Sequence, residues 1–134
     1  MDDNIRKLLP KDKGDTDNAR AIIALEYPAI APVLPDLMEW LQDFNWPVAK
    51  VIAPYLATIG EPLIPEVIRV LHTNDDIWKM WVLSLIVINM PVHIAMRLRN
   101  EIERIVANPT VGETEQGVVE VAEEILHKIE SNEK

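Results

Sequence analysis

Side chains that could act as nucleophiles are scarce in this sequence. It contains no cysteine, which excludes disulfides, a thiolate nucleophile and a sulfur-bound metal ion. The only serines are Ser84, inside the most apolar segment, and Ser131, near the end of the chain. We interpret Ser84 as a small residue that donates a hydrogen bond to a carbonyl one turn earlier, because no basic residue is spaced to activate it. The sequence therefore gives little support to nucleophilic catalysis.

One group of residues, His72, Asp75 and Asp76, resembles a site for a hard metal ion. These positions are better explained as helix ends: His72 closes one helix and the aspartates begin the next, where free amides and the helix dipole favour them. No further ligand lies at metal-site spacing. His93 and His127 are expected at the surface. We therefore predict neither a metal ion nor a cofactor.

Carboxylates are abundant, but their spacing is typical of a solvated surface. Those expected on polar helix faces are Glu101, Glu103, Glu120, Glu123 and Glu124. A catalytic carboxyl group needs burial or a like-charged neighbour to shift its pKa, and the spacing indicates neither. The four glycines are scattered along the chain, so no phosphate-binding loop is predicted.

Two short segments bring acids, an amide, a Trp and a Lys to predicted breaks between paired helices. The first contributes Asp43, Asn45, Trp46 and Lys50, and the second contributes Asp75, Asp76, Trp78 and Lys79. If the helices are stacked repeats, these breaks lie along one edge of the molecule. Aromatic side chains flanked by charges often dominate the binding energy of an interface. We therefore predict that this edge binds a partner.

A structural interpretation of the same edge is also open. In that case the acids and lysines form a ladder between repeats, and the Trp rings fill the gaps between units, since Trp is usually mostly buried. The two interpretations are compatible, because a Trp can pack its ring body and still expose its N–H edge.

An internal duplication shows how these segments are positioned. Residues 32–38 (PVLPDLM) are matched by residues 62–68 (PLIPEVI), and Leu41 is matched by Leu71 at the same offset. A spacing of about thirty residues is the length of one helix–turn–helix unit in a helical-repeat protein. A third, degenerate copy is expected to begin at Leu98, and its Ile102 and Ile105 would take the places of Met38 and Leu41.

The spacing of apolar residues predicts the helices. They are expected over residues 17–27, 34–41, 47–59, 62–71, 77–88 and 92–106, followed by a last helix after a capping box formed by Thr110 and Glu113. Gly60 is expected to end its helix as a left-handed cap. The 77–88 segment is apolar nearly all round, which places it at the centre of the domain.

These elements predict an all-α fold, a short α–α superhelix of the HEAT or armadillo type with about six to seven helices. We expect an N-terminal arm over residues 1–15, anchored by Leu8 and Leu9, then a single domain over residues 16–131 and a tail over residues 132–134. At 134 residues the chain can bury a core without disulfides.

The charge balance argues against nucleic acid and membranes as partners. Lys and Arg number 13 against 22 Asp and Glu, so the net charge is −9, which repels polyanions at long range. The first residues lack the apolar core of a secretion signal. The longest apolar stretch, residues 80–88, is too short to cross a bilayer. We expect a soluble cytoplasmic protein whose partner is a protein or a peptide.

Several segments resemble a bacterial family of small HEAT-like proteins described as domain of unknown function 5071. The matching segments are residues 8–13 (LLPKDK), 39–43 (EWLQD), 45–49 (NWPVA), 75–79 (DDIWK) with Trp81, and 108–110 (NPT) with Glu113. They occur in order over nearly the whole chain. The resemblance implies an α–α superhelix of the armadillo type and implies no activity.

Three functions remain as hypotheses. The first is a non-enzymatic module that binds a protein or peptide across the edge near Trp46 and Trp78, because helical repeats form extended binding surfaces. The second is an enzyme, a hydrolase or DNA-glycosylase-like protein on a HEAT-like scaffold that uses Asp43 or Asp76 beside a Trp. The negative charge disfavours the DNA-binding version, since phosphate contacts require Lys and Arg. The third is an immunity-type protein that neutralises a toxin with its acidic face.

Overall fold

The computed structural model describes residues 5–132, and this part of the chain is helical with no β-strand. The α-helices are α2 (Thr16–Ile23), α3 (Leu34–Glu39), α4 (Pro47–Leu56), α5 (Ile64–Leu71), α6 (Asp76–Leu85), α7 (Val92–Ala95), α8 (Arg99–Ala107), α9 (Val111–Glu115) and α10 (Val118–Asn132). Short 3₁₀ helices connect them: η1 (Ala31–Val33), η2 (Trp40–Gln42), η3 (Glu61–Leu63), η4 (Val87–Asn89) and η5 (Met96–Leu98). The predicted all-α class is confirmed.

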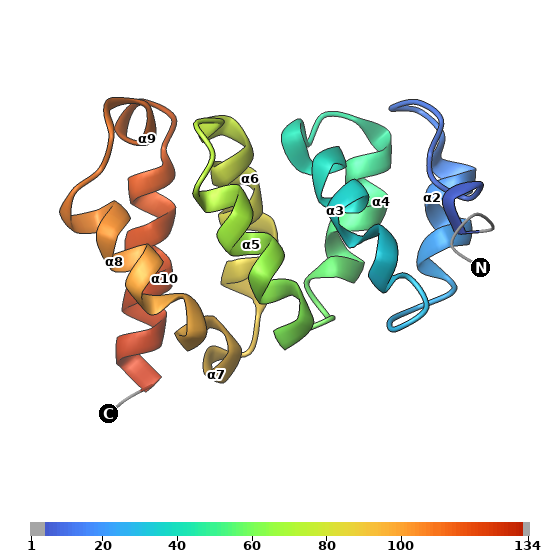
Figure 1. The fold of residues 1–134 in the computed structure, drawn as a ribbon. Coiled ribbons are helices and arrows are strands. Elements are labelled where there is room, and N and C mark those ends of the chain that lie inside the picture. The colour runs from blue at the N-terminus through green and yellow to red at the C-terminus, as the bar shows by residue number, and fades with distance from the viewer. Residues whose placement is uncertain (1–4, 133–134) are drawn as a thin grey trace.

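The helices lie side by side in a row that runs the length of the molecule (Figure 1). Helix α2 is near one end and α8, α9 and α10 are at the other, with α3 and α5 in front of α4 and α6. Helix α2 packs against α4, α5 against α6, and α10 against both α6 and α8. The connections after η2 and after α5, together with α9, lie on the upper edge of the row in this view.

The duplicated sequence corresponds to a duplicated pair of helical turns. In the first copy η1 leads directly into α3, and thirty residues later η3 leads directly into α5. Each of these four elements has a proline in its first turn, where the missing N–H removes no helical hydrogen bond. The paired prolines therefore explain why the same short 3₁₀ turn precedes the same helix in both copies.

The third copy keeps the buried positions of the first copy but begins its α-helix one residue later. Leu98, Ile102 and Ile105 are fully buried, as are Met38 and Leu41 of the first copy. Leu98 closes η5, whereas its predicted equivalent Leu34 begins α3. The third copy lacks the prolines that fix the start of the helix in the first two copies.

The predicted end of the helix over residues 47–59 is wrong. Helix α4 ends at Leu56, three residues before the predicted end at Ile59, because the chain turns there. Gly60 does have a positive φ of 86°, but its ψ of −139° lies outside the left-handed helical region. Gly60 therefore precedes η3 instead of capping α4.

Helix α6 is central in the row but less enclosed than predicted. It ends at Leu85, and the remainder of the predicted 77–88 helix continues as η4. Val82 and Leu83 are fully buried, whereas Ile77 is 46% exposed. Helix α6 packs against α5, η2 and α10, so one of its faces remains at the surface. None of the described helices, this one included, is long and apolar enough to cross a membrane.

The last helix buries the face that its sequence predicts. Its core residues are Val118, Ala122, Ile125 and Ile129, each at most 1% exposed. They follow the three- and four-residue steps of one helix face. The glutamates on the opposite side, Glu120, Glu123 and Glu124, are exposed. Helix α10 therefore covers α6 and α8 with its apolar side and directs its acidic side to solvent.

The described part of the N-terminal arm packs onto the helices. Leu8 and Leu9 contact the core, and Pro10 is buried. The Val48 amide donates a hydrogen bond to the Lys13 carbonyl at 3.0 Å, which ties the arm to the start of α4. Residues 1–4 of the predicted arm and residues 133–134 of the predicted tail lie outside the described residues.

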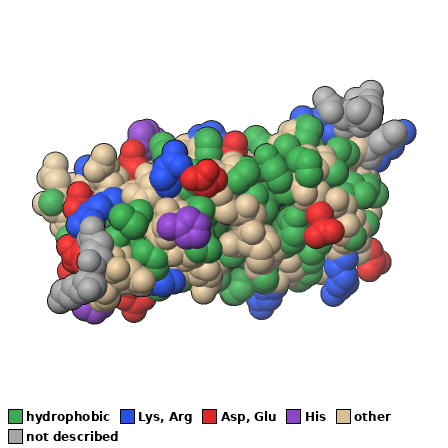
Figure 2. Space-filling view, turned by 90° about the horizontal axis from the view of Figure 1, so that it is seen from below, with side chains coloured by type: hydrophobic (Ala, Val, Ile, Leu, Met, Phe, Trp, Pro, Cys, Tyr) green, Lys and Arg blue, Asp and Glu red, His purple; other side chains and the backbone are tan. Residues whose placement is uncertain are grey.

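The lower edge of the row exposes apolar side chains near the N-terminus. Figure 2 views this lower edge and shows hydrophobic side chains gathered over the half near the N-terminus, with more charged side chains toward the C-terminus. Leu25 and Tyr27, in the connection from α2 to η1, are 43% and 40% exposed. The two Trp-containing segments therefore lie away from this exposed apolar connection, at the opposite edge.

Candidate functional site

The first of the two predicted edge segments is accessible in the structure. Asn45 and Lys50 are exposed, and Asp43 and Trp46 are half-buried. The Asp43 carboxylate accepts a hydrogen bond from the Asn45 amide at 2.8 Å, which shapes the turn between η2 and α4. The Lys50 ammonium lies 5.9 Å from the centre of the Phe44 ring. This segment therefore keeps part of each predicted side chain available to a partner.

The second segment is occupied mainly by contacts within the protein. Trp78 is 5% exposed, and its indole N–H donates a hydrogen bond to the Met38 carbonyl at 2.9 Å. The Arg69 guanidinium lies 5.7 Å from the centre of the Trp78 ring. The Asp75 carboxylate caps α6 by accepting from the Trp78 amide at 3.1 Å, as predicted for a helix start. These contacts favour the structural interpretation for Trp78, whose ring fills a gap between two units.

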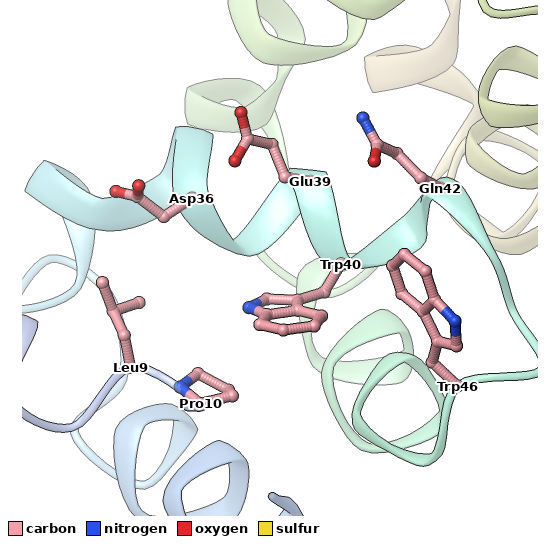
Figure 3. Close-up of a pocket in the computed structure, with 7 residues that line it drawn as sticks. All are labelled: Leu9, Pro10, Asp36, Glu39, Trp40, Gln42 and Trp46. Atoms are coloured by element: carbon pink, nitrogen blue, oxygen red, sulfur yellow. The ribbon is translucent and has the colours of Figure 1, made fainter. Parts of the chain in front are cut away.

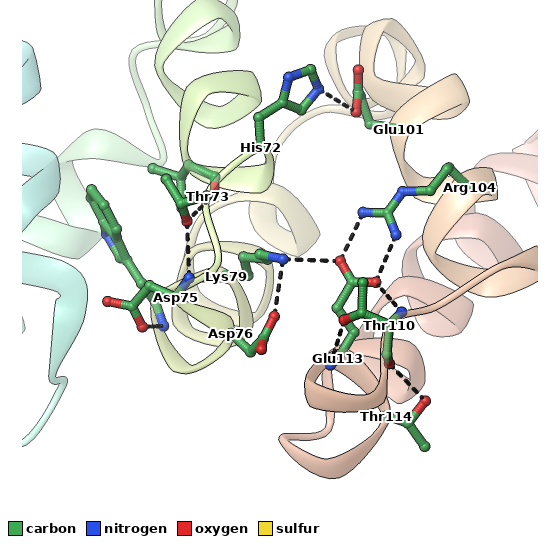
Figure 4. A network of polar contacts seen from close by, with 12 residues as sticks. His72, Thr73, Asp75, Asp76, Lys79, Glu101, Arg104, Thr110, Glu113 and Thr114 are labelled. Carbon is green, nitrogen blue, oxygen red and sulfur yellow. Dashed lines mark hydrogen bonds and ion pairs between the residues drawn. The ribbon is translucent and has the colours of Figure 1, made fainter.

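Lys79, also in the second segment, belongs to a buried ionic network (Figure 4). Lys79 is 3% exposed, and its ammonium lies 2.9 Å from the Asp76 carboxylate and 3.1 Å from the Glu113 carboxylate. Glu113 is fully buried, and the Arg104 guanidinium binds both of its oxygens at 2.7 Å. The Thr110 amide donates to the same carboxylate at 2.9 Å and completes the predicted capping box. Glu113 therefore joins α6, α8 and α9.

The surrounding cations keep Glu113 ionised despite its burial. The Arg104 guanidinium lowers the pKa of Glu113 from 4.5 to about 2, and hydrogen bonds from the Thr110 amide and Lys79 act in the same direction. Burial acts the other way, because it penalises the charged carboxylate. The Glu113 carboxylate in turn raises the pKa of Arg104. Glu113 and Arg104 are therefore both charged at neutral pH.

The arrangement of this network supports a structural role. The Lys79 ammonium is held between the carboxylates of Asp76 and Glu113, so its contacts lie inside the protein and not toward a substrate. A second contact joins neighbouring helices of the row: His72, the C-terminal cap of α5, lies 2.9 Å from Glu101 of α8. The ionic network and this contact therefore both connect the α5–α6 part of the row to the part that contains α8 and α9.

A pocket opens where the N-terminal arm meets the first helical unit (Figure 3). It has a volume of about 350 Å³ and is lined by Leu9, Pro10, Asp36, Glu39, Trp40, Gln42 and Trp46. The rings of Trp40 and Trp46 meet edge to face, with centroids 5.8 Å apart and planes at 76°. The nitrogen edge of Trp40 faces Leu9 and Pro10 in this view. The pocket therefore has an aromatic wall on one side and the arm on the other.

Polar side chains follow the helical segment along the rim of this pocket. Asp36, Glu39 and Gln42 recur at three-residue steps through α3 and η2. Arg6 donates a hydrogen bond to Asp36 at 3.4 Å, and the two side chains are 52% and 37% exposed. A contact of this length between exposed groups is weak. Asp36 is therefore only weakly paired with Arg6.

The residues that match a known protein family include those of both the pocket and the ionic network. A family model described as "Domain of unknown function (DUF5071)" matches residues 8–126. The chain belongs to the DUF5071 family. No curated protein matches the sequence significantly. The match begins in the N-terminal arm and ends inside α10, so residues 8–15 of the arm are part of the DUF5071 domain.

Sequence reasoning missed the pocket of this DUF5071 protein although the signal was present. Six of its seven lining residues lie in the segments that suggested the family, and Asp36 is the exception. The sequence indicates Trp46 through its position near a helix break, but the predicted domain boundary at residue 16 separates Trp46 from the arm. The combination of an apolar anchor at Leu9 with two Trp residues six positions apart was the available clue. Arg104 was missed as well, since nothing local pairs it with Glu113.

The backbone of Gly112, in α9 of the DUF5071 domain, lies directly against the ionic network of Lys79, Asp76 and Glu113. A Cβ at Gly112 would lie 2.0 Å from the nearer Asp76 carboxylate oxygen. Alanine ordinarily stabilises a helix by about 0.5–1 kcal/mol relative to glycine, but here Asp76 would have to move away from Lys79. We expect Gly112→Ala to lower the free energy of unfolding by roughly 1–3 kcal/mol, measured by urea denaturation.

A double-mutant cycle isolates the cause of this expected loss. With Asp76→Ala already in place the clash is absent, so Gly112→Ala should be neutral or slightly stabilising. An equal loss of stability in both backgrounds would show that the contact between Gly112 and Asp76 is not responsible.

Proposed function

We propose that this protein is a HEAT-like helical-repeat module that binds a protein or peptide at its upper edge and catalyses no reaction. The observation that carries the proposal is the pocket of about 350 Å³ walled by Trp40 and Trp46. Aromatic side chains in such pockets are the residues that most often dominate the energy of protein interfaces. A row of repeats adds a continuous surface on which the rest of a partner can lie.

The walls of the pocket are held in place before any partner arrives. The Trp46 amide donates a hydrogen bond to the Asp43 carbonyl at 3.1 Å, and Trp46 directly precedes the first-turn Pro47 of α4. Its ring is fixed further by the edge-to-face contact with Trp40. On the other side, Pro10 is buried against the helices. A site that is already ordered loses little conformational entropy on binding.

This proposal moves the predicted binding edge toward the N-terminus. Trp46, Asp43 and Asn45 remain candidates for partner contact, whereas Asp76 and Trp78 take part in internal packing. The enzyme hypothesis needs Asp43 or Asp76 as an acid or base. Asp43 accepts a hydrogen bond from its own turn, and Asp76 pairs with Lys79, so these contacts do not favour that role.

Selection from a phage-displayed library of random peptides on the full immobilised chain tests the proposal. We expect binders whose affinity falls at least about tenfold with Trp46→Ala, because loss of an interface hot spot typically has this effect. Leu25→Ala serves as the control, since Leu25 is 43% exposed on the connection from α2 to η1 and lies outside the pocket. Circular dichroism of each variant checks that helicity is unchanged. A selection without binders, or binders indifferent to Trp46→Ala, would contradict the proposal.

A further inference from the structure

We infer that the pocket between the arm and η2 binds the side chain of an arginine or lysine presented by a partner peptide. The inference rests on the proposed function and specifies what the peptide contributes. It combines three observations: two indole rings in the wall, two carboxylates on the rim, and an arginine of this chain already in contact with one of those carboxylates.

The aromatic wall suits a cation with an apolar stem. A guanidinium or ammonium group is attracted to the face of an indole ring, and its methylene stem packs on apolar surface. Within this protein two cations lie over aromatic rings: Arg69 lies over the indole ring of Trp78, and Lys50 lies over the phenyl ring of Phe44. Leu9 and Pro10 provide the apolar surface that a stem requires. At about 350 Å³ the pocket has room for one long side chain with its neighbouring backbone.

The charges on the rim select a positive ligand. Asp36 and Glu39 lie one helical turn apart on the same side of the segment, and the Gln42 side chain next to them can accept a hydrogen bond. The net charge of −9 strengthens the attraction for a cation and repels an anion. Two carboxylates beside an indole wall are the composition expected for a site that binds a guanidinium or ammonium group.

Arg6 acts as a weak internal competitor for this site. Its guanidinium already reaches Asp36, but only through one contact of 3.4 Å between half-exposed side chains. Such a contact contributes little stability and is easily replaced. A partner cation that reaches Asp36 would have to displace Arg6, so removing Arg6 should strengthen binding.

The test uses the full chain and capped five-residue peptides in which a single Arg, Lys or Gln stands at the centre of four glycines. Indole N–H signals are followed by ¹H–¹⁵N NMR during each titration and assigned with Trp→Phe variants. We expect the Arg and Lys peptides to shift the signals of Trp40 and Trp46, while the buried Trp78 signal stays in place. The Gln peptide should leave all signals unchanged. Equal shifts with the Gln peptide, or shifts confined to Trp78, would overturn the inference.

Charge-neutral variants measure the contribution of the rim. Asp36→Asn and Glu39→Gln together should weaken the Arg peptide about tenfold, and Arg6→Ala should strengthen it roughly two- to fivefold. Glu66→Gln is a matched control, since Glu66 occupies the position of Asp36 in the second copy and lies outside the pocket. An affinity that responds equally to the control and to the rim variants would contradict the inference.

The two proposals can fail separately. If phage-selected peptides lose affinity with Trp46→Ala but carry no basic residue and ignore Asp36→Asn with Glu39→Gln, the binding module stands and the cation site is refuted. If the library yields no Trp46-dependent binder and the Arg and Lys peptides cause no shift, both are refuted.

Free guanidinium ion, titrated at the same concentration, should bind more weakly than the Arg peptide, because it lacks the stem that packs on Leu9 and Pro10.

Discussion

Replacing Glu113 with Gln is expected to lower the free energy of unfolding by about 3 kcal/mol or more. Gln keeps the length of the side chain and an oxygen for the capping box, so the substitution removes mainly the charge. Lys79 would then retain Asp76 alone at 3% exposure, and Arg104 would lose its bidentate partner. In a domain of this size the melting temperature should fall by roughly 10 °C.

The same charge makes the stability depend on pH in acid. The pKa of Glu113 is about 2 in the folded protein against an ordinary value of 4.5. As the pH falls from 4.5 toward 2, the unfolded chain binds this proton before the folded chain does, so the folded state loses stability. The contribution of Glu113 is therefore fully present above pH 4.5 and disappears across that interval. The difference between the wild type and Glu113→Gln should shrink over the same range.

Urea denaturation followed by circular dichroism at several pH values checks both expectations. Glu115→Gln provides the matched control, because Glu115 lies in the same short helix α9 and is exposed. It should change the stability by less than about 0.5 kcal/mol. If Glu113→Gln has no larger effect than Glu115→Gln at neutral pH, the ionic network does not hold α9 against α6 and α8.

Much of the fold was predictable because its determinants are local. The two prolines in residues 32–38 recur in residues 62–68, and each pair defines a 3₁₀ turn followed by a helix. The box formed by Thr110 and Glu113 needs only residues three positions apart. The apolar face of α10 follows from helical spacing alone. Such features require no knowledge of which helices meet in space.

The site was less predictable because its contacts join distant parts of the chain. Lys79 and Glu113 are 34 positions apart, and Trp78 bonds to a carbonyl 40 positions earlier. Helical spacing gives the face on which a side chain lies but not the element that covers that face. One clue was nevertheless available. A lysine among Trp78, Met80 and Trp81 has little access to water, so a buried carboxylate partner was to be expected.

Trp78→Ala is expected to lower the free energy of unfolding by about 3–5 kcal/mol, the range measured for large aromatic residues removed from protein cores. The ring is 5% exposed, so its removal leaves a cavity between the first and second helical pairs. It also leaves the Met38 carbonyl without its indole donor. Trp78→Phe should fill part of the cavity but still lose that hydrogen bond, with an expected loss of about 1–3 kcal/mol.

Trp46→Ala provides the contrast that separates packing from binding. Trp46 is half-buried at the wall of an open pocket, so its removal should reduce stability by less than Trp78→Ala does while abolishing most peptide affinity. Thermal unfolding and peptide titration of both variants measure the two effects side by side. If Trp78→Ala left the stability unchanged, its ring would not be filling the gap between units. The row of helices would then owe its cohesion to the ionic network and the aliphatic core alone.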